Sequence, residues 1–546
     1  MKADRLDRQT GRISPAVLIF LAMIALALFV EEVVYHSVSE LIDARYQMAT
    51  MLNRSAKLLD TMKFDRLAKL STQLKQDILR SGPTASDQSA NRVNAKTVTV
   101  LASLEASRSF IPLNEQGETS RAPFLGIQLA ESASGARAVE LLGAHLEQVA
   151  HWYGQSAQQL RDLLLFDHSL FVDRHARLFH IDEALNDTQL EHERLLGSSV
   201  DAAIGSSISN TLFPEADTFS LHSKSDSTRI LYLNFRGFGA KPAFDLDKNV
   251  GTFSSSERAM IQRIWARVKE DYSAFDVDVT TEAPTNVTGK IGAMILITNQ
   301  TSDAGGYAYL NSFGRIDLQN PPAFCFQNQL ANAEKPIAEC ISHELGHTLG
   351  LHHQSTASAS YYGGSGAGET GWAPIMGVSY YKNLTQWSKG EYSGATNLED
   401  AYVVMAKRSL LPRVDDHGDT IAKATALQKV VSNGLNNLQG SGIINSPSDV
   451  DMFSFYAGTG PISVSVAPSA YSGNLDVALQ LYDASGKLLA SANAENALAA
   501  SLSFTSTKAG TYYLKVAGTG KGDPRTTGYS NYGSLGQYLI QATSAL

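Results

Sequence analysis

Cysteine is scarce in this sequence, with only Cys325 and Cys340 among 546 residues. A small extracellular fold held together by many disulfides is therefore excluded. Positive charge is not in excess either, since 45 Lys and Arg against 54 Asp and Glu give 45 − 54 = −9 with histidine neutral. A nucleic-acid partner requires a basic surface that neutralises phosphates, so no nucleic-acid partner is expected.

Long apolar runs are also scarce, apart from one that extends from Pro15 to Val30. Basic residues dominate before this run, and Glu31 and Glu32 follow it, so the rest of the chain is predicted to be exported. The run is long for the apolar part of a signal peptide and short for a spanning helix. Residues 1–35 are therefore predicted to be a signal anchor in the membrane, with a cleaved signal peptide as the less favoured alternative.

Two regions with helical periodicity follow. Residues 36–129 are predicted to be a helical stalk and a linker, and an ordinary pair of amphipathic helices is the alternative for the stalk. Residues 130–217 combine a helical pattern with a short hairpin near 169–181 and include a Ser/Gly/Ala-rich connection at 197–210. Proteases readily cut such a connection, so residues 130–217 are predicted to be a prosegment that shields a cleft until it is cut.

The pattern changes again in the second half of the chain. Residues 218–411 alternate strand and helix patterns, and Ser254 with Glu257 forms a capping box that predicts the start of a helix. Over residues 412–546, short β-type runs separated by Gly, Asp and Asn predict an antiparallel β-sandwich. The predicted fold class is multidomain, with a helical N-terminal region, an α+β domain and a C-terminal sandwich.

Four of the 13 histidines lie within the eleven residues from His343 to His353. His343 and His347 are four residues apart, so on a helix both imidazoles project from one face and can share a zinc ion. Glu344 lies beside the first of these ligands, where it can take a proton from a water molecule on the metal.

The end of the same motif supplies a third ligand. Gly350 can adopt a positive φ that ends the helix and reverses the chain. By spacing, His353 then reaches the metal, and the adjacent His352 does not. Three histidines leave one position of a tetrahedral zinc site open for water, whereas a structural site normally closes with a fourth protein ligand. A catalytic zinc ion, one per chain, is therefore predicted.

The pattern HExxHxxGxxH resembles the signature of the metzincin metallopeptidases. That resemblance implies a twisted mixed sheet with an active-site helix, and a tight turn that places a methionine beneath the zinc. Pro374-Ile375-Met376-Gly377 matches the turn. Some members carry a tyrosine two residues after this methionine that stabilises an oxyanion. Val378 stands there, so neither Tyr380 nor Tyr381 is predicted to be catalytic.

The resemblance also implies a substrate that lies antiparallel to an edge strand of the catalytic sheet. Gly305, Gly306, Tyr307 and Ala308 fall where that strand is expected, although an ordinary edge strand explains the same residues. Cys325 and Cys340 are predicted to form a disulfide next to the active-site helix, with a thiolate zinc ligand as the less favoured alternative.

A prosegment thiol is not expected to keep the enzyme inactive, because neither cysteine lies in the predicted prosegment. A prosegment carboxylate such as Asp167, Asp173 or Asp182 is the available substitute. The alternative is that these three residues only shape the hairpin and its turns.

The C-terminal segment resembles the bacterial pre-peptidase C-terminal domain on four motifs, namely Asp415 to Thr420, Asp449 to Phe453, Leu481 to Asp483 and Gly510 to Leu514. That family is a β-sandwich appended to secreted peptidases, often removed on maturation, and some members bind calcium. The acidic groups at 415–419 and 449–451 offer oxygen ligands for Ca²⁺, although aspartate is also routine in sandwich turns.

Together these features predict an exported zinc metalloendopeptidase, made as a zymogen, that acts on proteins or peptides in the bacterial cell envelope or after secretion. The competing interpretation is a membrane-tethered binding or adhesion protein with an inert zinc fold and a ligand-binding sandwich. A zinc hydrolase that acts on a non-peptide amide is a third alternative.

Overall fold

The computed structural model describes residues 124, 126–185, 211–314, 316–318 and 320–546. The chain divides into two compact units, residues 1–110 and 111–546, and every described residue belongs to the second. The predicted signal segment, nearly all of the predicted stalk and linker, and the Ser/Gly/Ala-rich connection lie outside the described residues. Within the described part of the chain, no helix is both long and apolar enough to cross a membrane.

The first described segment, residues 126–185, is called the N-terminal module below. Its elements are β1 (Ala133–Ser134), α5 (Gly135–Leu142), η1 (Gly143–His145), α6 (Leu146–Trp152), α7 (Ala157–Phe166), β2 (Leu170–Val172) and β3 (Leu178–Glu183). A capping box between Ser156 and Gln159 begins α7. Strands β2 and β3 pair antiparallel, which confirms the predicted hairpin. The apolar faces of the three α-helices pack into a core that is separate from the main core of the molecule.

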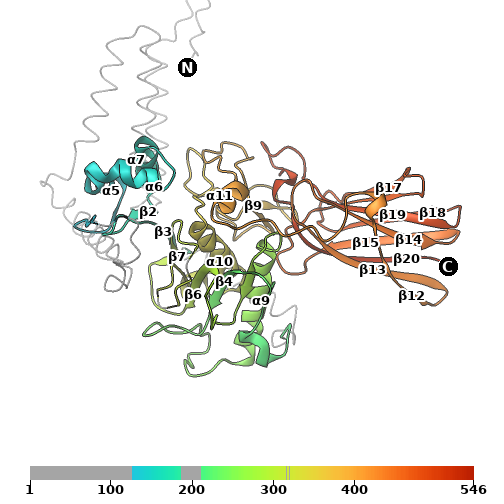
Figure 1. The fold of residues 1–546 in the computed structure, drawn as a ribbon, viewed down its shortest axis with the longest axis horizontal. Helices are drawn as coiled ribbons and strands as arrows, with labels where there is room; N and C mark the ends of the chain where they lie inside the picture. Colours follow the sequence, from blue (N-terminus) through green and yellow to red (C-terminus); the bar gives the residue numbers. More distant parts are fainter. Residues whose placement is uncertain (1–123, 125, 186–210, 315, 319) are drawn as a thin grey trace, which may run out of the picture. The chain divides into compact units, whose positions relative to one another are not determined.

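A sheet of eight strands joins this module to the α+β domain, in the order β1-β2-β3-β7-β8-β6-β4-β5. The strands of the α+β domain are β4 (Arg229–Asn234), β5 (Asp278–Thr280), β6 (Ile291–Thr298), β7 (Ala304–Tyr309) and β8 (Ala323–Phe326). Strands β4, β5, β6 and β8 are parallel, and β7 runs antiparallel to β8. Strand β3 covers the outer side of β7, so the sheet continues from one segment into the other (Figure 1).

The remaining elements of the α+β domain are η2 (Glu215–Phe219), α9 (Ser255–Asp271), η3 (Gln327–Leu330), α10 (Glu334–Thr348), β9 (Trp372–Pro374), β10 (Leu384–Gln386) and α11 (Ala401–Lys407). The predicted capping box of Ser254 and Glu257 begins α9. Helix α10 carries the histidine motif and is almost wholly buried. Strands β9 and β10 form a small parallel sheet.

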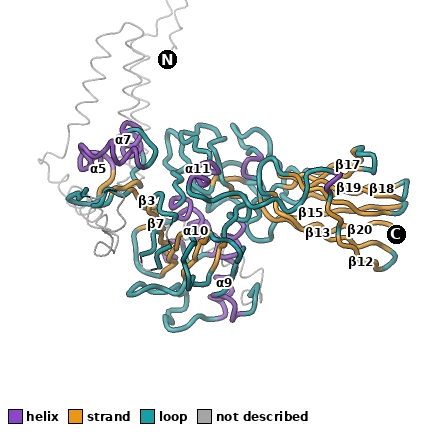
Figure 2. The backbone as a smooth tube through the Cα atoms, in the orientation of Figure 1, coloured by secondary structure: helices purple, strands orange, loops and turns teal. Residues whose placement is uncertain are grey.

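The C-terminal region is a sandwich of two five-stranded sheets, ordered β11-β14-β19-β16-β17 and β12-β13-β20-β15-β18 (Figure 2). Its elements are η4 (Ile421–Lys423), β11 (Thr425–Ala426), β12 (Gln428–Ser432), β13 (Leu435–Ile444), β14 (Val450–Ala457), β15 (Gly460–Pro468), β16 (Val477–Tyr482), β17 (Leu488–Ala492), β18 (Ala500–Ser506), β19 (Gly510–Gly518), η5 (Asn531–Gly533) and β20 (Gly536–Ala545). The expectation of a purely antiparallel sandwich is wrong at one edge, because β11 pairs parallel to β14. The chain between these two strands makes the β12–β13 hairpin in the other sheet, so β11 returns to β14 by a crossover rather than a tight turn.

The sandwich and the α+β domain share one continuous hydrophobic core. Buried polar contacts reinforce it: Asn474 Nδ2 donates to Asp271 Oδ1 at 2.8 Å, and Gln386 Nε2 donates to the Asn474 carbonyl at 2.6 Å. The rings of Tyr402 and Tyr532 stack with centroids 4.4 Å apart. The two regions therefore pack as one body.

Candidate metal centre and active site

Helix α10 places His343 and His347 one turn apart, with ring centroids separated by 4.8 Å. The Nδ1 atom of His343 lies 2.8 Å from the Ile375 carbonyl oxygen, and that of His347 lies 2.7 Å from the Leu351 carbonyl oxygen. A carbonyl partner keeps the proton on Nδ1 and leaves Nε2 as the free lone pair. Burial lowers the pKa of His347 to about 3, whereas at His353 the carboxylates of Asp167 and Asp182 outweigh burial and raise the pKa to about 10. A metal ion therefore binds a neutral His347 directly and displaces the proton of His353.

The chain reverses directly after α10. Gly350 has φ +99°, and a Cβ there would lie 2.3 Å from Asn311 Oδ1, so conformation and space both require glycine. The reversal brings His353 Nε2 to 3.0 Å from His347 Nε2. His352 turns away instead, and its Nδ1 lies 3.4 Å from His180 Nε2. The structure thus gathers the three histidines that the spacing singled out.

Met376 lies buried under this helix, as the resemblance implied. A Cβ on Gly346, in the middle of the motif, would lie 2.5 Å from Met376 Sδ. The Met376 carbonyl accepts a hydrogen bond from Gln354 N at 2.7 Å, and the preceding carbonyl of Ile375 is the partner of His343. The turn therefore supports the histidines both by packing and through the backbone.

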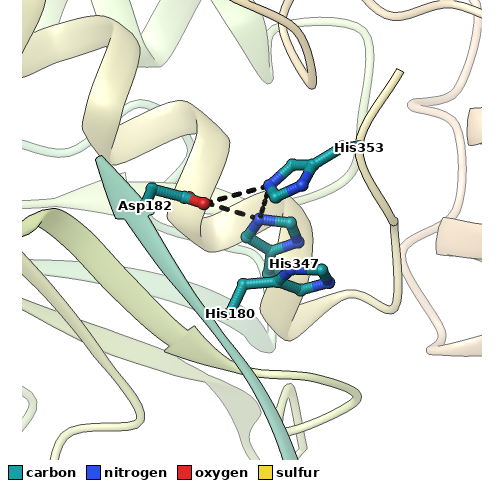
Figure 3. A group of neighbouring side chains, drawn as sticks. All are labelled: His180, Asp182, His347 and His353. Carbon is teal, nitrogen blue, oxygen red and sulfur yellow. Dashed lines mark hydrogen bonds and ion pairs between the residues drawn. The ribbon is translucent and has the colours of Figure 1, made fainter. Parts of the chain in front are cut away.

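A carboxylate from the N-terminal module lies among the three histidines. Asp182 Oδ2 is 3.2 Å from His343 Nε2. The same oxygen is 3.4 Å from His347 Nε2, and Asp182 Oδ1 is 3.0 Å from His353 Nε2 (Figure 3). Burial raises the pKa of Asp182, but the charges of His353 and His343 outweigh it and hold this pKa well below its usual range. Asp182 is thus a buried anion in contact with every predicted zinc ligand.

These separations fit a tetrahedral metal site. Ligands about 2.0–2.1 Å from a zinc ion lie roughly 3.3 Å from one another, which is close to the observed spacing. Among the described residues, the buried polar atoms without a hydrogen-bond partner include His343 Nε2, Asp182 Oδ2 and Glu344 Oε2. Orphaned buried lone pairs that converge on one point are costly unless a cation binds them. The residues therefore suit zinc.

His180 is a further histidine at this site, and it was not predicted. Together with Asp182, His347 and His353 it belongs to a group whose ligand atoms could hold one metal ion. His180 Nδ1 already lies 3.0 Å from Ser169 Oγ, and its Nε2 faces His352. Its ring stacks on His347 with centroids 4.1 Å apart. His343, whose Nε2 points at Asp182 without another partner, is therefore the better third ligand.

Asp167 of the N-terminal module approaches the third ligand from behind. Its Oδ2 lies 2.9 Å from His353 Nδ1, and its Oδ1 accepts hydrogen bonds from the backbone and side chain of Ser169. A carboxylate on the outer nitrogen of a ligating imidazole orients the ring and raises its basicity. Asp173 is placed elsewhere, in an ion pair of 2.5 Å with Arg177 inside the hairpin turn.

Glu344 is buried next to the same carboxylate. Burial, followed by the charge of Asp182, raises the pKa of Glu344 well above its usual range. A Cβ on Gly306 would lie 2.2 Å from Glu344 Oε1 and 2.9 Å from Cys340 Sγ. Glycine at this point of β7 therefore makes room for the predicted general base.

The expected substrate strand is β7 itself, which contains Gly305, Gly306, Tyr307 and Ala308. It is already paired, because β3 runs antiparallel to it with Asp182 opposite Gly306 and Ile181 opposite Tyr307. A Cβ on Gly305 would lie 2.8 Å from the Glu183 carbonyl, so the close approach of the two strands needs this glycine. The N-terminal module occupies the edge where a substrate was expected.

Tyr361 is a second residue at this site, after His180, that the sequence analysis missed. Its hydroxyl donates to Asp182 Oδ1 at 2.7 Å, and its ring centroid lies 4.2 Å from that of His353. A cavity of about 90 Å³ adjoins the site, lined among others by His343, Glu344, Tyr361 and Tyr380. Tyr361 follows His353 in a loop of small residues, and no spacing rule marked it.

The two cysteines are free thiols in the structure, in contrast to the expected disulfide. Strand β8 and helix α10 bring them close together, but each thiol donates to a backbone carbonyl, Cys340 to Gly305 at 3.6 Å and Cys325 to Ile337 at 3.9 Å. Burial and the neighbouring Cys325 raise the pKa of Cys340 well above its usual range. Cys340 is therefore a neutral thiol, unsuited to the alternative role of thiolate ligand.

Two overlapping acidic groups lie in the sandwich, formed by Asp415, Asp419 and Asp449 and by Asp415, Asp416 and Asp451. The Oδ1 atoms of Asp449 and Asp451 are buried without a hydrogen-bond partner among the described residues. Burial and neighbouring carboxylates raise the pKa of Asp449 to about 6 and that of Asp451 to about 8. Such crowded carboxylates are suited to a Ca²⁺ ion.

Comparisons with known proteins assign two regions. Residues 251–388 match metallo-peptidase family M12, and residues 449–518 match the bacterial pre-peptidase C-terminal domain. No protein with a curated function matches the chain.

Two examples represent the solved structures that are similar to part of the chain. One is the pre-peptidase C-terminal domain of a collagenase from Bacillus anthracis, with 19% identity and a TM-score of 0.16, covering 22% of this chain and 94% of that one. The other is PliG of Aeromonas hydrophila, a periplasmic inhibitor of g-type lysozyme, with 11% identity and a TM-score of 0.16, covering 22% of this chain and 96% of that one. From the family matches, the chain is a multidomain protein that carries a metallopeptidase domain of family M12 and a C-terminal pre-peptidase C-terminal domain.

Proposed function

We propose that the chain is a zinc-dependent metalloendopeptidase that hydrolyses peptide bonds in proteins and is made as a zymogen. The observation that carries this proposal is the convergence of His343, His347 and His353 on one point, with orphaned buried lone pairs around it. The match of residues 251–388 to a metallopeptidase family supports it independently. It disfavours the binding or adhesion protein with an inert zinc fold.

His343, His347 and His353 would hold the zinc ion through their Nε2 atoms. Zinc in this site supplies Lewis acidity, which lowers the pKa of a water molecule and polarises the scissile carbonyl. Glu344 takes the proton of the attacking water and delivers it to the leaving amine. Strand β7 binds the extended substrate through its backbone.

In the zymogen, strand β3 lies where the substrate binds and Asp182 fills the position that water needs. The prosegment residues His180 and Asp182 are two residues apart on β3, so both side chains lie on the face of the strand that is turned toward the histidines. Proteolysis within the Ser/Gly/Ala-rich connection at 197–210 releases the N-terminal module and opens β7. Of the three candidate latency carboxylates, Asp182 is the one that contacts all three metal-binding nitrogens.

The enzyme is exported through the segment at residues 1–35 and acts in the bacterial cell envelope or after release from it. The sandwich binds Ca²⁺ at the two groups that share Asp415, one with Asp419 and Asp449 and the other with Asp416 and Asp451, where the orphaned Oδ1 atoms of Asp449 and Asp451 support a cation. Calcium binding would raise the melting temperature of the full chain, and Asp451→Asn would remove that increase.

The test compares Asp182→Ala with Asp182→Ala/Glu344→Ala, each made as the full chain and then cut within 197–210 by an added serine protease that is inhibited before the assay, using a fluorogenic casein. The single variant should hydrolyse casein and lose this activity with a zinc chelator. The double variant should be about 10²–10⁴-fold slower, because the general base is gone, yet retain one zinc ion by native mass spectrometry. Equal hydrolysis by the two variants would contradict the proposed mechanism.

A further inference from the structure

The carboxylate of Asp182 presents two oxygens on one carbon at the metal site. The tetrahedral intermediate formed when water adds to a peptide carbonyl also has two oxygens on one carbon. Oδ2 faces His343 and His347, and Oδ1 faces His353 and the Tyr361 hydroxyl. The N-terminal module therefore shows which protein atoms meet each oxygen of the reacting group.

The backbone supports this reading of the carboxylate. Strand β3 is extended and antiparallel to β7, with Asp182 opposite Gly306 and His180 opposite Ala308. An extended substrate that pairs with β7 as β3 does would bring its backbone equally close to the metal site. Glu344 lies against Gly306, at the register position of Asp182. Glu344 and Tyr361 thus both reach the position that Asp182 takes, Glu344 on the side of β7 and Tyr361 from the loop after the third histidine.

Tyr361 stays in place without the N-terminal module, because its loop is fixed by the peptidase domain. The adjacent Tyr362 donates its N–H to the Gln354 carbonyl at 2.7 Å and accepts from Val378 N at 3.0 Å. Its ring stacks on Tyr392 with centroids 4.0 Å apart and an interplanar angle of 5°. The ring of Tyr361 itself packs on His353. Release of β3 removes the acceptor of Tyr361 and leaves its donor aimed at the active centre.

We propose that Tyr361 is a catalytic residue whose hydroxyl donates a hydrogen bond to the oxyanion of the tetrahedral intermediate, and that in the zymogen the same hydroxyl holds Asp182. This inference rests on the proposed peptidase function. Water forms the new C–O bond, its proton passes to Glu344, and the π electrons of the carbonyl move onto the oxygen. Tyr361 keeps its proton throughout, and the proton on Glu344 leaves with the amine when the C–N bond breaks.

The size of the effect follows from comparable donors. Removal of one oxyanion donor typically lowers kcat by about 10²–10³-fold. Tyr361→Phe keeps the ring that packs on His353 and removes only the hydroxyl. We therefore expect a loss in kcat with KM nearly unchanged, since the hydrogen bond strengthens as charge develops on the oxygen.

The experiment introduces Tyr361→Phe into the full chain that carries Asp182→Ala and is cut within 197–210 as above, with Tyr362→Phe in the same background as the matched control. Hydrolysis of the fluorogenic casein, zinc content by native mass spectrometry and the Kd of a phosphinic peptide are measured for each. The phosphinic group presents two oxygens on a tetrahedral centre. Tyr361→Phe should lower kcat about 100-fold and weaken phosphinate binding at least 10-fold, with one zinc ion retained, and Tyr362→Phe should change neither.

Three other outcomes would each overturn the inference. If Tyr361→Phe keeps both kcat and phosphinate affinity, Tyr361 is not the oxyanion donor, although the peptidase function stands. If Tyr380→Phe produces the losses and Tyr361→Phe does not, the donor is Tyr380, which lines the same cavity. If Asp182→Ala binds zinc but hydrolyses nothing beyond the level of its Glu344→Ala derivative, the peptidase function fails, and the role of Tyr361 fails with it.

Discussion

The N-terminal module and the C-terminal sandwich both contact the peptidase domain, but in opposite ways. The module has a hydrophobic core of its own, and it reaches the domain through β3, through polar side chains at the metal centre and through a few apolar side chains. Leu310 of the domain packs in the module's core, and Leu185 of the module packs in the main core. The sandwich shares the core of the domain and places Asn474 against the buried Asp271. Polar contacts at a strand edge can be exchanged for water or substrate, whereas a shared core cannot be opened without exposing apolar surface. The first contact suits release, and the second suits permanent attachment.

The sandwich also contacts the support of the active-site helix, because its residue Asn474 bonds to Asp271 at the end of α9. Asp271 Oδ2 accepts a hydrogen bond from Ser342 Oγ at 2.5 Å, and Ser342 directly precedes His343 on α10. The Asp271 carbonyl accepts from Trp387 Nε1 at 2.7 Å. The family resemblance implied a domain that is often removed on maturation. In this chain hydrogen bonds connect Asn474 of the sandwich through Asp271 to Ser342, the residue before His343.

The largest effects on folding and zinc binding are expected from deleting each region in turn. A chain without residues 1–210 should fold, bind one zinc ion and hydrolyse casein, because the deletion uncovers a strand edge and a few apolar side chains such as Leu310 but leaves nearly all of the main core in place. A chain that ends at residue 411 should fail to give a folded, zinc-binding protein, because the shared core is exposed to water. Zinc stoichiometry and thermal unfolding of both chains measure this. Stable folding of the second chain would show that the sandwich is a dispensable appendage.

A smaller effect is expected from one contact in the sandwich interface. Asn474→Ala removes a donor to the buried carboxylate of Asp271, and an unsatisfied buried group costs about 1–3 kcal/mol. The free energy of unfolding from urea titrations should fall by about that amount. Asn437→Ala is the matched control, since Asn437 bonds only to nearby carbonyls of an exposed hairpin and should cost less than about 0.5 kcal/mol. Equal losses in the two variants would argue against a special role for the interface.

A further prediction concerns pH. Burial raises the pKa of Glu270 to about 8, although Gln537 donates to both of its oxygens and Lys269 is nearby. The folded state therefore binds this proton more tightly than the unfolded state. The resulting stabilisation is fully present below about pH 4.5 and is lost as the pH rises through about 8. Between these values the wild type should lose stability relative to Glu270→Gln, as measured by melting temperature against pH. Parallel curves for the two proteins would contradict this assignment.

Local patterns predicted much of the structure. The capping box at Ser254, the hairpin near 169–181 and the strand around Gly306 depend on short-range chemistry, and all three occur. The spacing of the histidine motif likewise anticipates which imidazoles converge, because α10 and the reversal at Gly350 follow from helix periodicity and glycine conformation.

Long-range contacts could not be predicted in this way. Three aspartates in one hairpin look alike in sequence, and only the pairing of β3 with β7 places Asp182 on the histidines. Tyr361 depends on the path of an irregular loop with no periodicity. The state of the two cysteines depends on how the thiols meet carbonyls across β8 and α10. Each of these outcomes is set by tertiary packing.

The most direct test of the central claim is the zinc affinity of the uncut full chain and of uncut Asp182→Ala, measured by chelator competition. If Asp182 is the fourth ligand that keeps the enzyme latent, the variant should bind zinc about 10-fold or more weakly. Asp182→Asn, which keeps an acceptor for Tyr361 but loses the charge, should lie between the two. A variant that binds zinc as tightly as the wild type would contradict the claim.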